Sequence, residues 1–369
     1  MIPVNQPLLN GNEKNYLNRC VDTGWISSEG PFVAEFEQKF SARVNRKYGV
    51  AVCNGTAALD VAIEVLGIGP GDEVIMPSFT IVSCVGQIVR NGGIPVLVDS
   101  DPVTWNMDVS SIAEKITKRT KAIMVVHIYG LPVDMDPVLE LAKAHGLKVI
   151  EDAAEMHGQT YKGKPCGSFG DISIFSFYPN KHITTGEGGM VVTDNSQYAE
   201  DCKSLRNLCF QPHKRFVHER LGWNLRMTNM QAALGLAQLE RLDEFVSRKH
   251  RMGALYTKLL SGTPGIQLPL PATAYAENIY WVFGLVLDDH IGMNAETAMA
   301  VLAQKGIGTR PFFYPMHQQP FLRRMGFFAN ERYPHSERMY ARGFYIPSGL
   351  ALTDEQIEAS AAAVRDILR

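Results

Sequence analysis

A single lysine, Lys181, stands in a loop rich in glycine and threonine, within residues 175–189 (FSFYPNKHITTGEGG). An amine attacks a carbonyl carbon only when it is deprotonated, and a lysine reaches that state in a desolvated or cation-rich pocket. Such a lysine can form a Schiff base with an aldehyde cofactor. An isolated loop lysine is more often simply solvated, so this interpretation depends on the residues that accompany Lys181.

Two carboxylates could accompany that lysine. Asp152 and Glu155, in residues 151–158 (EDAAEMHG), follow an apolar run that predicts a buried strand. A buried carboxylate needs a cation or a strong donor as its partner, because leaving it unpaired costs several kcal/mol. A protonated pyridine nitrogen would be such a partner for Asp152. A helix cap after the strand is the alternative interpretation.

A third segment, Asn54-Gly55-Thr56-Ala57, lies between an expected strand and an expected helix. Glycine allows the backbone to approach a ligand closely, and the first N–H groups of a helix can bind an anion such as a phosphate. The Thr56 hydroxyl adds a donor. A plain strand-to-helix turn is the alternative, and no Gly-Lys-Ser/Thr follows as in a Walker loop.

These three segments would meet if each followed a strand of one sheet. Strands and helices alternate from about residue 48 to 194, which predicts an α/β fold with a mainly parallel sheet covered on both faces. In such a sheet, ligands bind beyond the carboxyl ends of the strands. We expect strands at 48–53, 73–76, 94–98, 121–127, 147–152 and 172–177, and a strand of opposite direction at 189–193.

The remainder predicts a second, smaller domain. A helix from about 227 to 248, with leucines on one side, would connect a large domain at 1–249 to an α+β domain at 250–369. We expect a strand at 280–287. Thr353 and Gln356 have the spacing of a capping box, so a last helix should begin there.

Composition excludes several classes of protein. The chain has 369 residues, 46% of them hydrophobic, and a net charge of −2, so we expect neither a nucleic-acid partner nor a membrane partner. No apolar run has the length of a membrane span, and the N-terminus lacks the pattern of a signal peptide. The six cysteines include no CxxC pair. We therefore expect a cytoplasmic protein without disulfides and without a metal site.

Together these segments resemble the sugar aminotransferases of the DegT/DnrJ/StrS group, which belong to fold type I of the enzymes that use pyridoxal 5'-phosphate (PLP). The similarity covers nearly the whole chain. It includes residues 25–30 (WISSEG), 71–77 (GDEVIMP), 224–228 (NLRMT) and 231–235 (QAALG). Within the group, the Lys181 loop and residues 309–317 (TRPFFYPMH) are most similar to the GDP-perosamine synthases.

The resemblance implies PLP, alternating with its amine form PMP, as cofactor, and a role for each matching residue. Lys181 would be the catalytic, Schiff-base lysine, and Asp152 would pair with the pyridine nitrogen. The other cofactor-binding residues would be Gly55, Thr56, Ile81, Glu155, Ser176 and Asn224. Asn224 would reach the phosphate of the neighbouring subunit, which implies a homodimer with shared active sites. The sugar nucleotide would contact His317 and, by a weaker match, Ser27, Arg310 and Tyr314.

Two residues depart from the group's pattern. Relatives usually place an aromatic residue against the PLP ring where this chain has Ile81, and an aliphatic side chain loses the stacking geometry. Leu225 stands where tyrosine is common. The group also includes dehydratases with histidine in place of the lysine. Here Lys181 is present and His182 only follows it, which favours transamination.

The resemblance therefore implies transfer of an amino group from glutamate to a 4-keto-6-deoxy sugar nucleotide. The most similar branch makes GDP-perosamine from GDP-4-keto-6-deoxymannose, for O-antigen or another surface polysaccharide. A PLP- or PMP-dependent dehydratase, and an aminotransferase acting on a dTDP- or UDP-linked keto sugar, are the alternatives. A protein that binds PLP or a sugar nucleotide without catalysis would leave the complete cofactor set unexplained.

Overall fold

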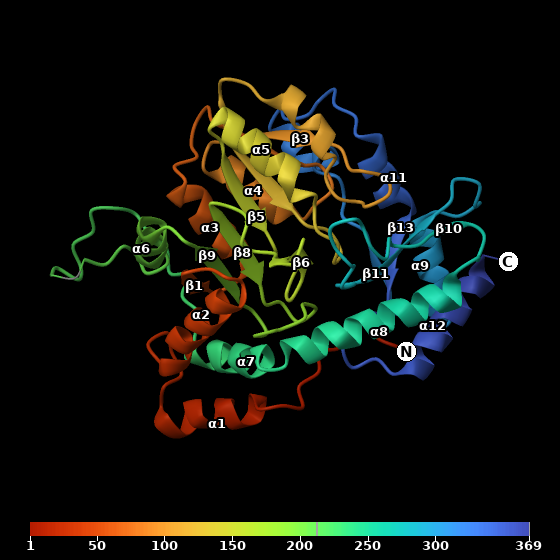
Figure 1. Ribbon diagram of the computed structural model, residues 1–369, viewed down its shortest axis with the longest axis horizontal. Helices are drawn as coiled ribbons and strands as arrows, with labels where there is room; N and C mark the ends of the chain where they lie inside the picture. The colour runs from red at the N-terminus through yellow and green to blue at the C-terminus, as the bar shows by residue number, and fades with distance from the viewer. Residues whose placement is uncertain (212, 369) are drawn as a thin grey trace.

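The computed structural model describes residues 1–211 and 213–368. Its largest feature is a seven-stranded sheet in the order β1-β9-β8-β5-β4-β2-β3 (Figure 1). The strands are β1 (Tyr48–Val52), β2 (Glu73–Pro77), β3 (Ile94–Val98), β4 (Thr120–Val126), β5 (Lys148–Asp152), β8 (Ile172–Ser176) and β9 (Gly189–Thr193). All seven expected strands are therefore present.

The direction of the strands also matches the prediction. The neighbours from β3 through β2, β4 and β5 to β8 pair in parallel. Only β9 runs the other way, pairing antiparallel with both β8 and β1. The carboxyl ends of β1, β2, β4, β5 and β8 consequently face the same edge of the sheet, as a ligand site of this fold class requires.

Helices cover both faces of this sheet because its strands are apolar on both sides. Val74 and Met76 of β2 pack with α3, α4 and α6, whereas Ile75 packs on the opposite face with α2, α5 and α7. The helices of this part are α1 (Glu13–Thr23), α2 (Pro31–Arg43), α3 (Gly55–Val65), α4 (Val82–Arg90), α5 (Met135–His145), α6 (Ser196–Leu205) and α7 (Asn229–Leu239).

The C-terminal part has its own antiparallel sheet, in the order β10-β11-β13-β12 (Figure 1). Its strands are β10 (Ile266–Gln267), β11 (Phe283–Leu287), β12 (Arg310–Pro311) and β13 (Gly343–Ile346). Its helices are α8 (Leu242–Leu260), α9 (Ala295–Gln304), α10 (Pro320–Arg324), α11 (Pro334–Arg342) and α12 (Asp354–Ile367). Residues of α8, α9, α12 and this sheet form a separate hydrophobic cluster. The predicted capping box at Thr353 and Gln356 opens α12.

The boundary between a domain at 1–249 and one at 250–369 stays a prediction, and it falls inside α8. Two predicted elements are wrong in extent. The helix expected at 227–248 is two helices, α7 and α8, separated at Glu240 and Arg241, where Arg241 leaves helical geometry with ψ 12. The strand expected from residue 280 begins at Phe283, because Tyr280 has a left-handed backbone with φ 49. Among the described residues, no helix has both the length and the apolar character to cross a membrane.

Candidate active site

A cavity of about 530 Å³ opens beyond the carboxyl ends of the central strands. Seven of the eight residues expected to bind the cofactor line it: Gly55, Thr56, Ile81, Asp152, Glu155, Ser176 and Lys181. They come from five separate places: after β1, after β2, at the end of β5, at the end of β8, and in the loop before β9. The sheet topology therefore brings the three predicted segments together.

One end of the cavity is suited to an anion. Asn54 caps α3 by accepting the Ala57 N–H, and Gly55 and Thr56 of the first turn line the cavity, with N–H groups that have no acceptor within the helix. The Thr56 and Ser83 hydroxyls lie 2.8 Å apart beside it. Residue 55 must be glycine, because a Cβ there would lie 2.8 Å from the Ser176 Cβ. The arrangement supplies backbone and hydroxyl donors of the kind that bind a phosphate.

The middle of the cavity holds the amine of Lys181. Its Nζ lies 3.7 Å from Glu155 Oε1 and 3.8 Å from the centre of the Trp281 ring. Burial lowers the pKa of Lys181, although Glu155 and Asp152 oppose that shift. Burial likewise raises the pKa of Glu155 to about 7. The lysine is thus desolvated, as a nucleophilic amine requires.

Asp152 is buried at the end of β5. Its Oδ1 accepts the Ala154 N–H at 3.0 Å, and its Oδ2 lies 3.4 Å from the Cys84 thiol, which donates to it. Burial raises the pKa of Asp152, so the carboxylate would gain from a cationic partner. The next regular element after β5 is the short strand β6 (Thr160–Tyr161), which pairs with β7 (Lys164–Pro165). With no helix to cap in the described segment between β5 and β6, the helix-cap interpretation is wrong.

Comparison with known proteins decides the family. Residues 7–365 match the DegT/DnrJ/EryC1/StrS aminotransferase family. The chain belongs to this family. It is 44% identical to a GDP-perosamine synthase of Escherichia coli O157:H7, over 96% of this chain and 95% of the relative, and 42% identical to a GDP-perosamine synthase of Caulobacter vibrioides, over 100% and 98%. A Streptococcus pneumoniae structure in a PLP form superposes with a TM-score of 0.92 at 26% identity, over 99% and 98% of the two chains.

This membership identifies the chain as a PLP-dependent aminotransferase. The cavity fits the cofactor in size and in chemistry. It has donors for a phosphate at the α3 end, an amine for an aldehyde, and a buried carboxylate for a pyridinium nitrogen. Asn180 Oδ1, in a residue that also lines the cavity, is buried without a hydrogen-bond partner among the described residues, so it could accept a bond from a bound ligand.

Five residues that the resemblance assigned do not line the cavity of the single chain. Asn224 and Ser27 are exposed, and the bridge partner of Asn224 is Asn207. Arg310 is exposed on β12, and the Tyr314 ring packs edge-on against Tyr340. His317 is fully buried: its Nδ1 lies 2.8 Å from the Ser78 hydroxyl, and its Nε2 lies 3.0 Å from Glu337. Their roles stay predictions.

Other lining residues were not expected from the sequence. Phe313, Trp281 and Tyr345 come from the C-terminal part and close the cavity from that side. Ser83 and Asn180 lie within three residues of predicted site residues, so only their side-chain direction was unknown. Phe313 lies in the matched segment 309–317, next to Tyr314. Trp281 and Tyr345 carry no local motif, and contacts between distant segments were needed to find them.

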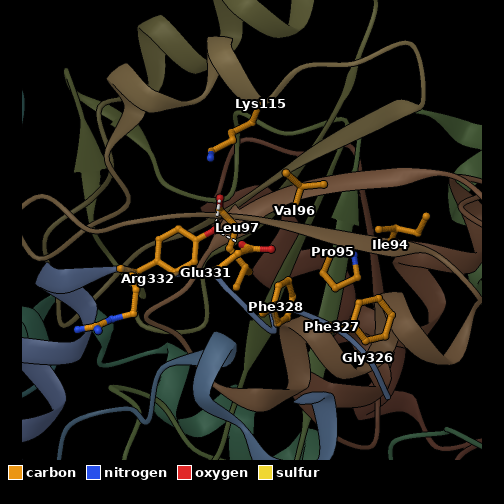
Figure 2. Close-up of a pocket in the computed structure, with 11 residues that line it drawn as sticks. Ile94, Pro95, Val96, Leu97, Lys115, Gly326, Phe327, Phe328, Glu331 and Arg332 are labelled. Atoms are coloured by element: carbon orange, nitrogen blue, oxygen red, sulfur yellow. Dashed lines mark hydrogen bonds between the residues drawn. The ribbon is translucent and has the colours of Figure 1, made fainter. Parts of the chain in front are cut away.

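A second hollow, of about 570 Å³, lies at the edge of the large sheet (Figure 2). It is lined by β3, Lys115 and residues 326–328 and 331–333. Pro95 leaves this edge strand without one N–H, and the Tyr333 hydroxyl donates to the Leu97 carbonyl at 3.0 Å. At this hollow, residues 326–328 and 331–333 cover the edge strand β3. The hollow shares no lining residue with the cavity that contains Lys181.

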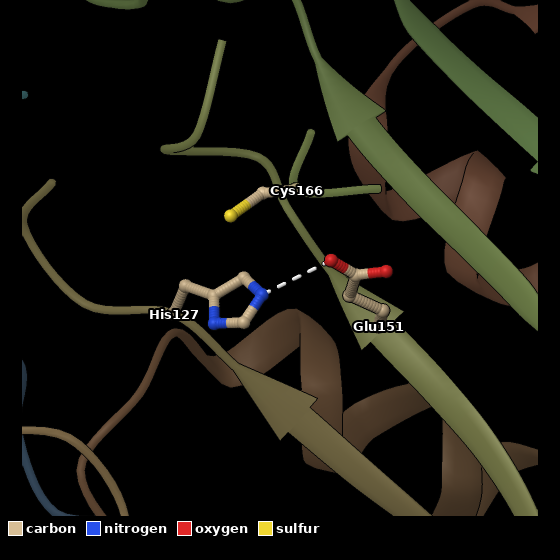
Figure 3. A group of neighbouring side chains, drawn as sticks. All are labelled: His127, Glu151 and Cys166. Atoms are coloured by element: carbon tan, nitrogen blue, oxygen red, sulfur yellow. Dashed lines mark hydrogen bonds and ion pairs between the residues drawn. The ribbon is translucent and has the colours of Figure 1, made fainter. Parts of the chain in front are cut away.

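A buried group of His127, Glu151 and Cys166 has the composition of a metal site (Figure 3). His127 Nδ1 accepts the Val133 N–H at 3.0 Å, so Nε2 carries the proton and donates to Glu151 at 3.2 Å. Glu151 also accepts the N–H groups of residues 167, 169 and 170 and the Ser173 hydroxyl. The lone pairs of His127 and Glu151 are used in these hydrogen bonds, and the group anchors the loop before β8 to the end of β5.

Proposed function

We propose that this enzyme transfers an amino group from glutamate to GDP-4-keto-6-deoxymannose and forms GDP-perosamine, a precursor of O-antigen or another surface polysaccharide. The observation that carries the proposal is the 44% and 42% identity, over nearly the full length, to two GDP-perosamine synthases. The similarity extends through both parts of the chain. A location in the cytoplasm, where such nucleotide sugars are made, belongs to the same proposal.

We assign the cofactor contacts by their position in the cavity. Lys181 would hold the aldehyde through its amine, and Asp152 would pair with the pyridine nitrogen. The helix turn that contains Gly55 and Thr56, together with Ser176, binds the phosphate. Ile81 would pack on one face of the ring, and Glu155 would lie beside the ring hydroxyl.

When bound, PLP supplies an electron sink for the carbanion that forms at the reacting carbon. The side chains of this chain do the rest. The Lys181 amine removes the proton from the Cα atom of glutamate, and later returns a proton to the C4 atom of the sugar. Asp152 keeps a negative charge next to the ring nitrogen and so holds a proton there. Trp281, Phe313 and Tyr345 exclude water from the side of the C-terminal part.

We also propose a homodimer in which Asn224 completes the phosphate site of the partner subunit. Thr228 caps α7 with a full capping box, so the following helix does not need Asn224 as a cap. Asn224 is exposed and outside the cavity of its own chain. The preceding segment presents Phe216 and Leu221 with exposed fractions of 81% and 91%, which is typical of a surface covered by a partner.

A two-stage assay tests the function. The purified PLP enzyme is first mixed with glutamate and followed by its cofactor absorbance, and GDP-, dTDP- and UDP-linked 4-keto-6-deoxy sugars are then added in separate reactions. Amination of the GDP sugar at C4, identified by mass and NMR, is the expected result. Amination only of a dTDP or UDP sugar would favour the second alternative. Loss of a sugar hydroxyl without nitrogen gain would identify a dehydratase.

A further inference from the structure

A second lysine, Lys249, is buried in the middle of α8 with an exposed fraction of 1%. Its Nζ donates to two backbone carbonyls, that of Trp281 at 2.8 Å and that of Ser348. Among the described residues, it forms no ion pair with a carboxylate, and burial lowers its pKa to about 7. A neutral amine has two N–H groups, one for each carbonyl, so this site needs no counter-ion.

Both carbonyls belong to segments next to the cavity. Trp281 lies just before β11, and Ser348 lies just after β13. The two strands pair at this end through Phe283 and Ile346. The Ser348 hydroxyl accepts the Phe283 N–H at 2.9 Å, and the Ser348 N–H donates to Val4. Lys249 therefore ties α8 to the end of the sheet that carries the cavity's aromatic side chains.

The packing around Trp281 indicates that its position is imposed by α8. Tyr280 has a left-handed backbone, φ 49, which is uncommon for a bulky residue and persists only where the surroundings hold it. Its ring lies against α8 at Gly253, where a Cβ would approach the ring to 2.2 Å. Gly253 is one helical turn after Lys249, on the same face. Tyr280 thus packs on the helix, while the next residue turns its ring into the cavity.

The other side of Trp281 faces the reactive lysine. Its ring lies 3.8 Å from Lys181 Nζ, and its indole N–H donates to the Asn180 carbonyl at 2.8 Å. A ring face at this distance stabilises the ammonium form of lysine. We propose that Lys249 is a positioning residue, which acts through Trp281 to hold the aromatic face against Lys181. The inference rests on the role proposed above for Lys181.

Direct electrostatic action of Lys249 on Lys181 would have the opposite sign. A nearby positive charge lowers the pKa of an amine, so its removal would raise that pKa. Loss of the Trp281 ring face, in contrast, would lower the pKa of Lys181, because the ring stabilises its ammonium form. The titratable groups that interact electrostatically with Lys181 are Glu155, Asp152, Cys84, His157 and His182. His182 also faces Lys249.

The test follows the rate at which the cofactor-free, full-length protein captures PLP, measured against pH, since this profile reports the free amine of Lys181. Lys249→Met should move the midpoint down by about half a pH unit to one unit, as expected for a lost cation–π contact. Lys249→Gln, which keeps an N–H donor, should move it less. Lys258→Met, at an exposed position of the same helix, is the matched control and should not move it.

A double-mutant cycle shows whether the effect passes through the indole ring. Trp281→Leu should lower the midpoint by a similar amount, and adding Lys249→Met should lower it no further. An unchanged or raised midpoint in folded Lys249→Met, or a raised midpoint in folded Lys249→Gln, would overturn the proposal, and so would a full additional shift in the Trp281→Leu background. If the wild-type protein does not capture PLP on Lys181, the assignment of that lysine fails and the inference fails with it. If the wild-type protein captures PLP on Lys181 but Lys249→Met does not move the midpoint, the inference fails and the role of Lys181 stands.

Discussion

Glu155 Oε1 lies 3.7 Å from Lys181 Nζ in a buried site. Each group weakens the effect of burial on the other, because opposite charges at this distance favour the charged forms. Burial nevertheless dominates both shifts, which leaves the carboxyl with a pKa of about 7 and the amine with a lowered pKa. The Glu155 carboxyl therefore changes its protonation state near neutral pH, beside the amine that the proposed reaction uses.

The first prediction concerns the negative charge at residue 152. Asp152→Asn keeps the shape of the side chain and removes the charge expected to hold a proton on the ring nitrogen. The turnover number should fall by about 10²- to 10⁴-fold, the range typical of lost acid–base roles. Steady-state kinetics with saturating PLP gives the measurement, and circular dichroism checks the fold. A loss below about threefold would mean that Asp152 does not serve the cofactor.

The second prediction uses the raised pKa of Glu155. In the cofactor-free protein, the folded state holds this proton up to about pH 7, whereas the unfolded state releases it near the ordinary value of 4.5. The folded state binds more protons than the unfolded state between these pH values. The contribution of this proton to the free energy of unfolding is therefore fully present at low pH and is lost as pH rises through 7. Glu155→Gln removes this loss. The difference in melting temperature between Glu155→Gln and the wild type should therefore increase, in favour of the variant, by a few degrees from pH 5 to pH 8.

An exposed carboxylate at the same cavity provides the control for that experiment. Glu187 also lines the cavity, and its side chain is exposed. Glu187→Gln should follow the pH trend of the wild type, because an exposed carboxylate keeps its hydration. A wild-type melting temperature that rises from pH 5 to 8 relative to Glu155→Gln would contradict the predicted sign.

Local sequence was sufficient for the segments that surround the cofactor. Asp152 and Ser176 end apolar strands, and Gly55 separates a strand from a helix, so the parallel topology alone brought them together. Contacts between distant segments were beyond such reasoning. Trp281 and Tyr345 reach the cavity only through the packing of the C-terminal sheet. The break between α7 and α8 was missed because apolar residues keep helical spacing across Glu240 and Arg241.

The third prediction concerns the side chain against the ring. Ile81 lines the cavity with an exposed fraction of 47%. The resemblance to the sugar aminotransferases implies an aromatic residue at this position in most relatives. Ile81→Phe should restore stacking, which is worth about 0.5–1.5 kcal/mol, and tighten PLP binding by roughly 2- to 10-fold. Dissociation of the cofactor, followed by absorbance during dilution, measures the change. Val82→Phe, at an exposed position outside the cavity, should leave the affinity unaltered. Equal or weaker binding by Ile81→Phe would mean that Ile81 does not contact the ring.

The last prediction is that each active site contains Asn224 from the partner subunit. A dianionic phosphate needs more donors than one helix N-terminus supplies, and Asn224 is outside the cavity of its own chain. Lys181→Ala should be inactive, and an Asn224 variant that has lost activity should regain it when the two are mixed and allowed to exchange subunits. In a mixed dimer, one site would have both defects and the other neither. Random exchange of subunits between equal amounts of the two variants should therefore restore about a quarter of wild-type activity. If Asn224 acts within its own chain, every site keeps one defect and mixing restores nothing. A fully active protein that sediments as a monomer at the assay concentration would also exclude the shared site.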